Sequence, residues 1–397
     1  MKVGHKHQKV QNSFAVKSII IKWQVAETFM PALFSPISLA NDMIFTAERL
    51  TSLEQWLSSL PKHLDLALQT LTAASSDASF RRYLRINTAS PSGNAPASYI
   101  VMDAPPSHED CKPFVAIAQQ MHANGVPVPE IIASDLENGF LLLTDFGDIT
   151  FLSKVENSEA SHASNFYNAA ITSLIGLQQN VPSNNPHWPL PPYNREVLLR
   201  ELMLYPDWYI AQHKRIELTE KERASMLASF ELIIGNNLSQ PKVAVHRDYH
   251  SRNLMVLSGS DLAPNLGIID FQDALDGPIT YDLVSLLRDA YIEWREPEVI
   301  DWAISYWEKA KKAGLPVSDQ FGEFYKDFEW MGLQRHIKVL GIFARLAIRD
   351  GKERYLADMP LVSKYCLAAA QRYIALKPLA NLMLRVEGTQ NTVGYTF

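Results

Sequence analysis

The pattern of apolar and polar positions predicts a small sheet-rich region followed by a larger helical one. Apolar residues recur at intervals of three and four from Thr46 to Pro61, which predicts a helix that the proline ends. Residues 108–125 show the same periodicity, and Gly125 predicts where that helix closes. Short apolar or alternating runs predict strands at 64–71, 81–86, 97–104 and 139–148. Residues 62–148 are therefore expected to form a small sheet with one helix.

The rest of the chain is mostly helical in pattern. Helical periodicity covers 158–181, 194–213, 218–238, 280–294, 298–313, 322–350 and 360–384. Only the segment 243–272 departs from it, because its apolar runs "KVAVH", "NLMVL" and "LGIID" predict strands that flank a polar loop. We therefore expect an α+β chain with a small β-rich lobe over 43–148, a hinge near 143–148, and a larger, mainly α-helical lobe over 149–397.

Composition and charge narrow the class of protein. Of 397 residues, 47% are hydrophobic and 20% are charged, which is typical of a soluble globular chain. A net charge of −6 argues against a nucleic-acid partner. Cys111 and Cys366 are far apart, so a disulfide framework is not expected and a reducing cytoplasm fits. No uncharged apolar run reaches the roughly 18–20 residues of a membrane span, and nothing calls for an obligatory protein partner.

The N-terminal residues 1–42 differ from the rest. They are rich in lysine, poor in acids, and end in an apolar stretch that Pro31 and Pro36 interrupt. An export signal would need an uninterrupted apolar region. We interpret this segment as a disordered or mis-started extension, with the functional start near Met43.

The stretch "VAVHRDYHSRNLMVL" (243–257) carries the strongest candidate chemistry. Its order and spacing fit the H-R-D-x-x-x-x-N catalytic loop of kinases. Asp248 would accept the proton of an attacking hydroxyl, Asn253 would bind magnesium, and His246 would brace the loop. Asp270 follows an apolar run in "IIDFQD", where a carboxylate would bridge magnesium to nucleotide phosphates. ATP and Mg²⁺ are therefore the expected cofactors.

The triplet Asp145-Phe146-Gly147 spells D-F-G, but we interpret it as unrelated to magnesium. It precedes the H-R-D loop, whereas a functional D-F-G follows it. Its position at the end of the small sheet predicts a hinge, where the backbone at Asp145 rather than its carboxylate would meet adenine.

The small lobe departs from the common kinase plan. It lacks G-x-G-x-x-G, and Met102 stands roughly where a phosphate-contacting lysine is expected. The serine-rich turn that contains Ser79, together with Arg81 or Arg82, would cradle the phosphates instead. Alternation along a strand sends these two arginines to opposite faces, so we expect at least one to reach a phosphate.

The motifs together resemble a known family. His250 stands two residues after Asp248, where protein kinases usually carry lysine, as in the aminoglycoside phosphotransferase and choline kinase superfamily. Between residues 46 and 385 the chain resembles the anomeric N-acetylmuramate/N-acetylglucosamine kinases of bacterial cell-wall recycling. The likeness is carried by "SDASFRRYLR" (76–85), "LLLTDFGD" (141–148), "HRDYHSRNLM" (246–255) and "IDFQDALDGPITYDLVSLLRD" (269–289). It implies a two-lobed protein-kinase-like fold and phosphorylation of an amino sugar at its C1 hydroxyl.

The acceptor side rests on single residues rather than on a motif. Asp282 is expected to bond back to the catalytic loop as a structural brace. The resemblance places Arg288 by a lactyl carboxylate and Asp289 by sugar hydroxyls, whereas periodicity alone allows a solvated ion pair. An aromatic or a lone histidine on a helix is more often structural than a ligand. The candidate substrate contacts are Arg288, Asp289, Trp208, Arg335, His336 and His250.

Two alternatives stay open at this point. One is another small-molecule kinase of the same fold, acting on an aminoglycoside, choline or homoserine. Arg288 and Arg335 favour an anionic acceptor over a polycationic drug. The other is a nucleotide-binding regulator without turnover, which Met102 favours and the complete set of catalytic residues opposes.

Overall fold

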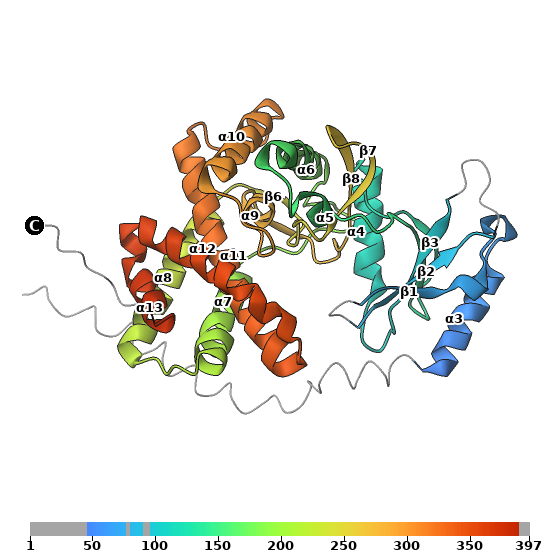
Figure 1. Cartoon of the computed structure of the whole chain (residues 1–397), viewed down its shortest axis with the longest axis horizontal. Coiled ribbons are helices and arrows are strands. Elements are labelled where there is room, and N and C mark those ends of the chain that lie inside the picture. The colour runs from blue at the N-terminus through green and yellow to red at the C-terminus, as the bar shows by residue number, and fades with distance from the viewer. Residues whose placement is uncertain (1–45, 77–79, 90–95, 389–397) are drawn as a thin grey trace, which may run out of the picture. The chain divides into compact units, whose positions relative to one another are not determined.

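The computed structural model describes residues 46–76, 80–89 and 96–388 (Figure 1). The extension predicted over 1–42 and the phosphate-turn residue Ser79 lie outside these described residues. Residues 45–397 form one compact unit. Within it, the N-terminal lobe comprises the elements from α3 to β5, and the C-terminal lobe comprises those from α5 to α13.

The N-terminal lobe is an antiparallel five-stranded sheet between two helices. The strand order is β1-β2-β3-β5-β4. Thr46 caps the first helix by accepting a hydrogen bond from the backbone of Arg49, and Asp110 caps the second in the same way at Lys112. The elements are α3 (Ala47–Ser59), β1 (Thr72–Ser76), β2 (Arg82–Asn87), β3 (Ser98–Asp103), α4 (Cys111–Ala123), β4 (Ile131–Asp135) and β5 (Phe140–Thr144).

Strand alternation divides the apolar residues of this sheet between the two helices. Leu84, Ile86 and Leu142 pack with α3, and the neighbouring Leu141 and Leu143 belong to the large core that includes α4. Burying each such side chain stabilises the fold by about 1.5–3 kcal/mol. The sheet is therefore apolar on both faces, and β3 and β5 in its middle are almost wholly buried.

The strand predicted at 64–71 is wrong. This segment forms two 3₁₀ turns, Lys62–Leu64 and Leu68–Thr70, because Asp65 adopts a left-handed conformation (φ 49°) that interrupts extended backbone. The first strand instead begins at Thr72, directly after the segment predicted as a strand. The short edge strand β4 has no equivalent among the predicted strands. The other predicted elements of this lobe are confirmed within a few residues at their ends.

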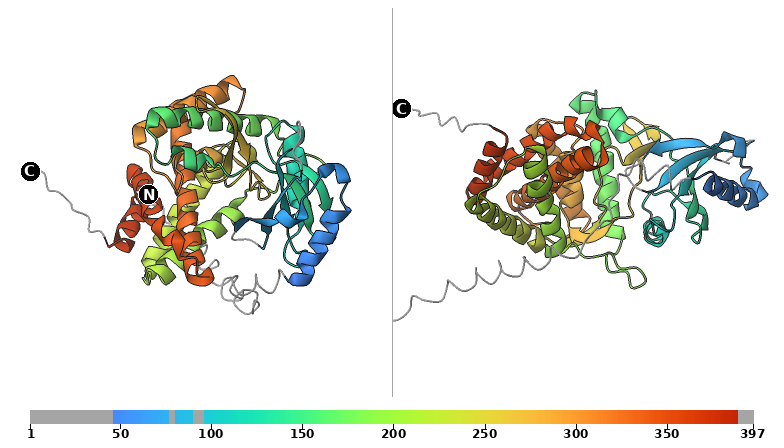
Figure 2. Two further views of the ribbon diagram at one scale, coloured as in Figure 1. Left: turned by 45° about the vertical axis from the view of Figure 1, so that its right-hand side comes forward. Right: turned by 90° about the horizontal axis from the view of Figure 1, so that it is seen from below.

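The C-terminal lobe is mostly helical, as predicted, and carries two short antiparallel strand pairs, β6 with β9 and β7 with β8. Figure 2 shows its helices gathered on the side away from α3 and the sheet. The helices are α5 (Phe151–Val155), α6 (Ala160–Asn180), α7 (Arg195–Leu204), α8 (Glu220–Ser239), α9 (Tyr281–Leu287), α10 (Glu296–Lys312), α11 (Phe321–Asp350), α12 (Met359–Arg372) and α13 (Lys377–Val386). The strands are β6 (Lys242–Val245), β7 (Leu254–Ser260), β8 (Ala263–Ile268) and β9 (Leu275–Pro278).

Three predicted helices differ in detail from the observed ones. The helix predicted over 194–213 is α-helical only to Leu204 and continues as a π-helical segment, Tyr205–His213. The helix predicted over 280–294 ends at Leu287. The one predicted over 360–384 is divided by extended backbone at Tyr373 (φ −114°, ψ 122°). The strand β9 has no predicted equivalent.

The long helix α11 crosses the C-terminal lobe (Figure 1), and its Arg335 contacts the loop that follows β6. Its Gly341 lies directly against Leu204, where a Cβ atom would come within 2.4 Å of the Leu204 carbonyl carbon. The glycine therefore permits the close approach of α11 to the end of α7. Across the described ranges, no helix is long and apolar enough to cross a membrane.

Candidate active site

The loop between β6 and β7 is fixed by hydrogen bonds to its backbone. The fully buried carboxylate of Asp282 accepts from the N–H groups of His246 (2.6 Å) and Arg247 (3.0 Å). The N–H of Asp248 donates to Nδ1 of His246 (3.2 Å), so Nε2 of the same ring donates to the carbonyl of Ile269 (3.1 Å). Burial lowers the pKa of His246 to about 4, so this ring is neutral and ties the loop to the segment after β8.

Two positions of the site have backbone conformations that residues with side chains rarely adopt. The φ angle is +79° at Arg247 and +65° at Asp270. Such conformations cost about 1–3 kcal/mol and persist where surrounding contacts hold them. At Arg247 the Asp282 carboxylate supplies that contact. Burial raises the pKa of Asp282 to about 7, although its two N–H donors act in the opposite direction.

Asp248 is the one carboxylate of the loop 246–253, and 41% of its side chain is exposed. Its Oδ1 lies 3.8 Å from Nη1 of Arg335 on α11. Partial removal from water acts to raise the pKa of Asp248, but the cations Arg335 and Lys338 outweigh it and lower that pKa to about 2. Asp248 is therefore ionised at neutral pH and able to accept a hydrogen bond from a hydroxyl group.

A buried ionic network behind the loop has no counterpart in the sequence predictions. Glu201 of α7 accepts from Nη2 of Arg247 (2.6 Å), from Nζ of Lys338 (3.0 Å), and from the hydroxyl of Tyr193. Its side chain is only 6% exposed. The available signal was the helical spacing of Glu201 with Leu198, a residue buried on the same face. An acid on the buried face of a helix indicates a cationic partner.

Asn253 and Asp270 come together, as the order of the strands predicts. Nδ2 of Asn253 donates to Oδ2 of Asp270 (3.3 Å) and to the carbonyl of Asp248 (3.1 Å). Nε2 of Gln272 donates to Oδ1 of Asp270 (2.7 Å), and the Oε1 atom of Gln272 is buried without a partner. Carboxylate and amide oxygens are ligands that Mg²⁺ prefers. The pair thus fits a magnesium ion whose other ligands are phosphate oxygens and water.

A cavity of about 480 Å³ opens beside this pair. Apolar side chains of β2, β3 and β5 line it from the N-terminal lobe, and the catalytic loop and the residues after β8 line it from the C-terminal lobe. An apolar wall opposite polar ligands suits a nucleotide, whose base packs while its phosphates reach the metal site. Among the lining residues are Tyr83, Ile100, Leu143, Phe146, Asn253 and Asp270.

Asp145 is engaged by Arg85, a pocket residue that the sequence predictions missed. Both guanidinium edges of Arg85 donate to acids, at 3.1 Å to Oδ1 of Asp145 and 2.7 Å to Asp148. Ser98 donates to Asp145 as well (2.7 Å). Burial acts to raise the pKa of Asp145, but the hydrogen bonds from Arg85 and Ser98 outweigh it and lower that pKa. The carboxylate of Asp145 therefore joins the sheet to the segment after β5. The sequence could have pointed to Arg85, because it lies two positions after Tyr83 and so on the same face of the strand.

Arg82 does not face the cavity, contrary to one of the two expectations for the arginine pair. It shares the face of Leu84 and Ile86, where its Nη2 donates to Asp103 (2.6 Å). Asp103 is wholly buried and also accepts from Nε of Arg49 on α3 (2.8 Å). Arg82 is thus part of a structural pair that joins α3 to the sheet.

Strand alternation places Arg81 on the same side of the sheet as Tyr83 and Arg85, which line the cavity. Its Nη2 donates to Glu109 (3.1 Å), just before α4. Its side chain is 11% exposed. An ion pair of this kind fixes the guanidinium group at the end of the sheet, near the segment that the sequence predicts to cradle phosphates. Of the two arginines, Arg81 is the one that shares a side of the sheet with the cavity-lining Tyr83 and Arg85, although it does not itself line the cavity.

Asp289 lies behind the catalytic loop rather than in front of it. It is 1% exposed, and Oδ2 accepts from both the backbone (2.9 Å) and the hydroxyl of Ser251. Its Oδ1 accepts from the N–H of Tyr291 (3.1 Å). Both carboxylate oxygens are therefore used within the protein. The expected contact with sugar hydroxyls gives way to a bracing role like that of Asp282, because the helix ends before Asp289.

Arg288 and His336 also point elsewhere. Nη2 of Arg288 donates to the hydroxyl of Tyr325 (3.3 Å), and His336 donates from Nε2 to the carbonyl of Arg288 (2.8 Å). Tyr325 precedes Arg335, the residue facing Asp248, by ten positions on α11, a rise of about 15 Å. Burial lowers the pKa of His336 to about 3, so its ring is neutral. The contacts place both residues in the structure of the lobe and away from the catalytic loop.

Trp208 packs against the hydrophobic core on the π-helical segment. Its neighbour Tyr209 donates to Glu387 (2.7 Å). Within the described part of the chain, no hydrogen bond or ring contact joins Trp208 to the catalytic loop. Arg335 and His250, in contrast, do lie at the loop. His250 packs edge-on against Tyr291 with ring centroids 5.3 Å apart, and its Nδ1 is buried without a partner.

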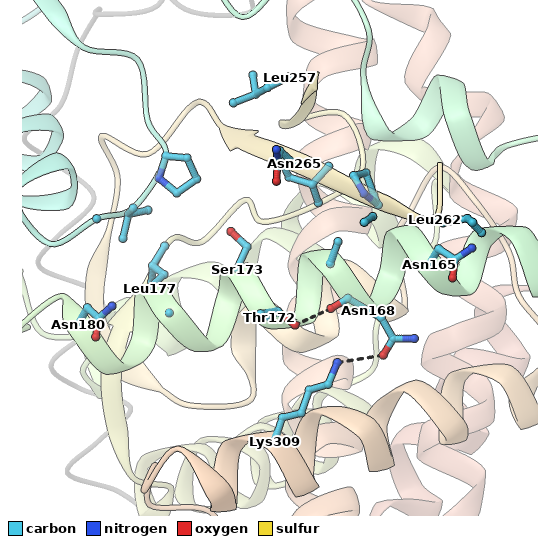
Figure 3. Close-up of a pocket in the computed structure, with 18 residues that line it drawn as sticks. Asn165, Asn168, Thr172, Ser173, Leu177, Asn180, Leu257, Leu262, Asn265 and Lys309 are labelled. Atoms are coloured by element: carbon cyan, nitrogen blue, oxygen red, sulfur yellow. Dashed lines mark hydrogen bonds between the residues drawn. The ribbon is translucent and has the colours of Figure 1, made fainter. Parts of the chain in front are cut away.

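A larger cavity of about 700 Å³ lies elsewhere, between α6 and the β7–β8 hairpin (Figure 3). Asparagine side chains and Lys309 line it, and Nζ of Lys309 donates to Asn168 (3.0 Å). None of the catalytic-loop residues contributes to this cavity. Volume alone therefore does not choose between the two cavities. The smaller one is the candidate active site because Asn253 and Asp270 line it.

The sheet-rich and helical lobes, with a braced loop after β6 and the Asn253–Asp270 pair facing a cavity between them, define a protein-kinase-like fold. The chain belongs to the phosphotransferase enzyme family, whose model matches residues 70–317.

Relatives of known name are similar over most of the chain. An N-acetylmuramate/N-acetylglucosamine kinase from Neisseria meningitidis is 42% identical over 353 residues, which cover 88% of this chain and 100% of that protein. A protein of the same name from Pseudomonas aeruginosa is 44% identical over 313 residues, covering 79% of this chain and 87% of that one.

Solved structures support the same fold at much lower identity. An ethanolamine kinase from Plasmodium vivax has a TM-score of 0.56 at 11% identity, covering 88% of this chain and 93% of that one. A choline kinase from Streptococcus pneumoniae has a TM-score of 0.54 at 13% identity, covering 81% of this chain and 100% of that one. At such identities the likeness concerns the fold alone.

Proposed function

We propose that this protein transfers the γ-phosphoryl group of ATP to the anomeric C1 hydroxyl of N-acetylmuramate, N-acetylglucosamine or both. The observation that carries the proposal is the hydrogen bonding of Asn253 to both Asp248 and Asp270, in a chain 42–44% identical to kinases named for these two sugars. The product would be a sugar 1-phosphate, which a nucleotidyltransferase of cell-wall recycling can use.

Asp248 orients the C1 hydroxyl group and accepts its proton. The freed oxygen forms a bond to the γ-phosphorus while the bond from that phosphorus to the bridging oxygen of ADP breaks. Because the transition state develops little covalent bonding to the protein, positioning and neutralisation of charge supply most of the rate. The hydrogen bonds of Asp282 to the loop backbone serve this positioning.

Asn253 and Asp270 would hold the magnesium ion, which neutralises charge on the phosphate oxygens when it is bound. Magnesium commonly takes only one or two carboxylates from the protein and completes its shell with phosphates and water. The described residues contain no cluster of three or more histidine, cysteine, aspartate or glutamate side chains fit to hold a metal. Arg81 is the proposed phosphate contact, and the backbone after β5 the proposed adenine contact.

The alternative acceptors fit the electrostatics less well. Choline and aminoglycosides are cations and need carboxylates or aromatic cages at the acceptor site. Asp248 instead faces Arg335, with Lys338 close behind it. A regulator without turnover would not need an ionised carboxylate held in this way. Met102, the feature in favour of such a regulator, is simply a buried core residue of β3.

We expect phosphorylation to abolish the reducing end of the sugar. A C1 phosphate blocks the free anomeric carbon, whereas a phosphate at any other hydroxyl leaves it intact. Each sugar is to be incubated with the protein, ATP and Mg²⁺, and the mass gain of one phosphoryl group compared with a reducing-sugar assay of the same sample. A phosphorylated product that still reduces would overturn the assignment to C1. A chain carrying Asp248→Asn serves as the blank.

Replacement of Arg81 by alanine is expected to raise KM for ATP by about 10- to 100-fold, because one charge-assisted contact to a phosphate is lost. KM for the sugar should change little. Arg82→Ala is the matched control, since it removes the same group one residue away on the opposite face of the sheet. If Arg82→Ala raised KM for ATP as much as Arg81→Ala does, the phosphate assignment would be wrong. Initial rates over a range of ATP concentrations give the answer.

A further inference from the structure

Arg252 is an exposed arginine on the catalytic loop, one residue before Asn253. It lines the same cavity as Asn253 and Asp270. Its guanidinium carbon lies 3.5 Å from the ring centroid of Tyr291, a close stacking distance. Among residues 46–76, 80–89 and 96–388 it makes no hydrogen bond or ion pair. An arginine in this state has a fixed position while the donors along its edge stay available.

Tyr291, on which Arg252 lies, is itself tied to the catalytic loop. Its backbone N–H donates to Asp289 (3.1 Å), and the other oxygen of Asp289 holds the backbone of Ser251 (2.9 Å). Its ring also contacts His250 (5.3 Å between centroids). The guanidinium group of Arg252 therefore stacks on an aromatic ring whose position is fixed relative to the loop that contains Asp248.

The other cations at the site are already committed. They are paired as follows: Arg335 with Asp248, Lys338 with Glu201, and the cavity-lining Arg85 with Asp145 and Asp148. Burial raises the pKa of Asp358 and the charge of Arg252 acts to lower it, but no ion pair joins these two described side chains. Arg252 is thus a positively charged group at the cavity lined by Asn253 and Asp270, and its hydrogen-bonding capacity is not used within the described part of the protein.

A planar guanidinium group of this kind suits a carboxylate, which it binds through two parallel hydrogen bonds. The transferred phosphoryl group is the other anion to consider, but the proposed function already gives the phosphates to the Asn253–Asp270 pair and Arg81. Tyr291 and His250 also place an aromatic wall and an unpartnered ring nitrogen, Nδ1 of His250, beside Arg252. A sugar ring with polar substituents would cover both.

We propose that Arg252, held on the face of Tyr291, binds the carboxylate of a carboxylate-bearing acceptor sugar and so sets the preference between the two amino sugars. The inference builds on the proposed function, because it places the acceptor beside Asp248. It assigns to Arg252 the contact that the sequence pattern suggests for Arg288. N-acetylmuramate carries a lactyl carboxylate and N-acetylglucosamine has none, so the two substrates differ in the group that Arg252 would bind.

The test compares Arg252→Gln with the wild-type full-length chain on both sugars at saturating ATP. We expect kcat/KM for N-acetylmuramate to fall by about 10- to 100-fold, mainly through KM, since one charge-assisted pair is lost. KM for ATP and kcat/KM for N-acetylglucosamine should stay close to wild type. Tyr291→Leu, which removes the stacking face, should give a weaker loss with the same selectivity, whereas Tyr291→Phe should resemble wild type.

Arg195→Gln is the charge control, because Arg195 is exposed and paired with Glu231 on the surface of the lobe. It should leave both sugars unaffected. An equal loss with both sugars in Arg252→Gln, or an effect confined to kcat or to ATP, would overturn the carboxylate assignment and indicate a phosphoryl contact. Unchanged kinetics would overturn it as well. If the wild-type chain phosphorylates neither sugar, the proposed function fails and this inference fails with it, a result distinct from the first two.

Discussion

Replacement of Asp248 by asparagine should lower kcat by about 10²- to 10⁴-fold, the range that a general base contributes. The asparagine keeps the shape of the side chain but cannot take the proton of the C1 hydroxyl. ATP binding should stay nearly intact, because the cavity walls and the Asn253–Asp270 pair are unchanged. Turnover by coupled ADP release and ATP affinity by calorimetry measure the two quantities separately.

Asp261→Asn is the matched control for this experiment, since Asp261 is an exposed acid on the β7–β8 hairpin, paired with Lys154. It should retain wild-type turnover. The pH dependence gives a second check. Because the pKa of Asp248 is about 2, protonation of this carboxylate cannot produce a loss of activity between about pH 5 and 7. Retained turnover in Asp248→Asn would remove this residue from the role of base.

Replacement of Glu201 by glutamine should destabilise the protein by about 3–5 kcal/mol, the usual cost of removing one partner from a buried ionic pair. Arg247 and Lys338 would be left with buried positive charge and no compensating anion. Activity should fall too, because Arg247 belongs to the catalytic loop. Urea unfolding, followed by tryptophan fluorescence, measures the free energy of unfolding.

The matched control for Glu201 is Glu231→Gln, which breaks an exposed ion pair with Arg195 and should cost no more than about 1 kcal/mol. Equal stability of the two variants would show that the buried network contributes nothing particular. The acid dependence has a defined sign. Burial acts to raise the pKa of Glu201, but Lys338 and Arg247 outweigh it and lower that pKa. Its stabilising contribution is therefore present at neutral pH and is lost as the pH falls.

Local periodicity predicted most helices and strands. It did not predict where a helix ends, and so it did not predict the directions of the side chains that follow that end. The helix expected over 280–294 stops at Leu287, so Arg288 and Asp289 do not follow the helical direction that the pattern gave them. Asp289 turns to the back of the catalytic loop, and Arg288 turns toward Tyr325. A helix boundary depends on which tertiary contacts replace the next turn, and these contacts are not written in the local sequence.

The strand containing Arg82 shows the opposite case. Alternation alone placed Arg81 and Arg82 on opposite faces, and the structure bears this out through their different acids, Glu109 and Asp103. What alternation could not tell is which face opens to the cavity. That depends on α3 covering one side of the sheet, a contact between segments that lie far apart along the chain.

The sequence by itself determined the order and spacing of the candidate catalytic residues along the chain. Motif spacing placed Asp248, Asn253 and Asp270 at the ends of neighbouring strands, and motif order separated the D-F-G triplet at Asp145 from the proposed metal ligands. These features are local, because short strands and the loops between them fix the positions of the side chains at their ends.

Only the tertiary structure decided which charges surround that chemistry. Glu201, Arg247 and Lys338 come from three distant segments, and no local pattern links them before α7 and α11 pack against the catalytic loop. The same packing pairs Arg335 with Asp248. It leaves Arg252 on the face of Tyr291 with its hydrogen-bond donors available. A buried charged group needs a partner of opposite charge, and that partner usually comes from a distant segment of the chain. The pairing therefore depends on long-range contacts.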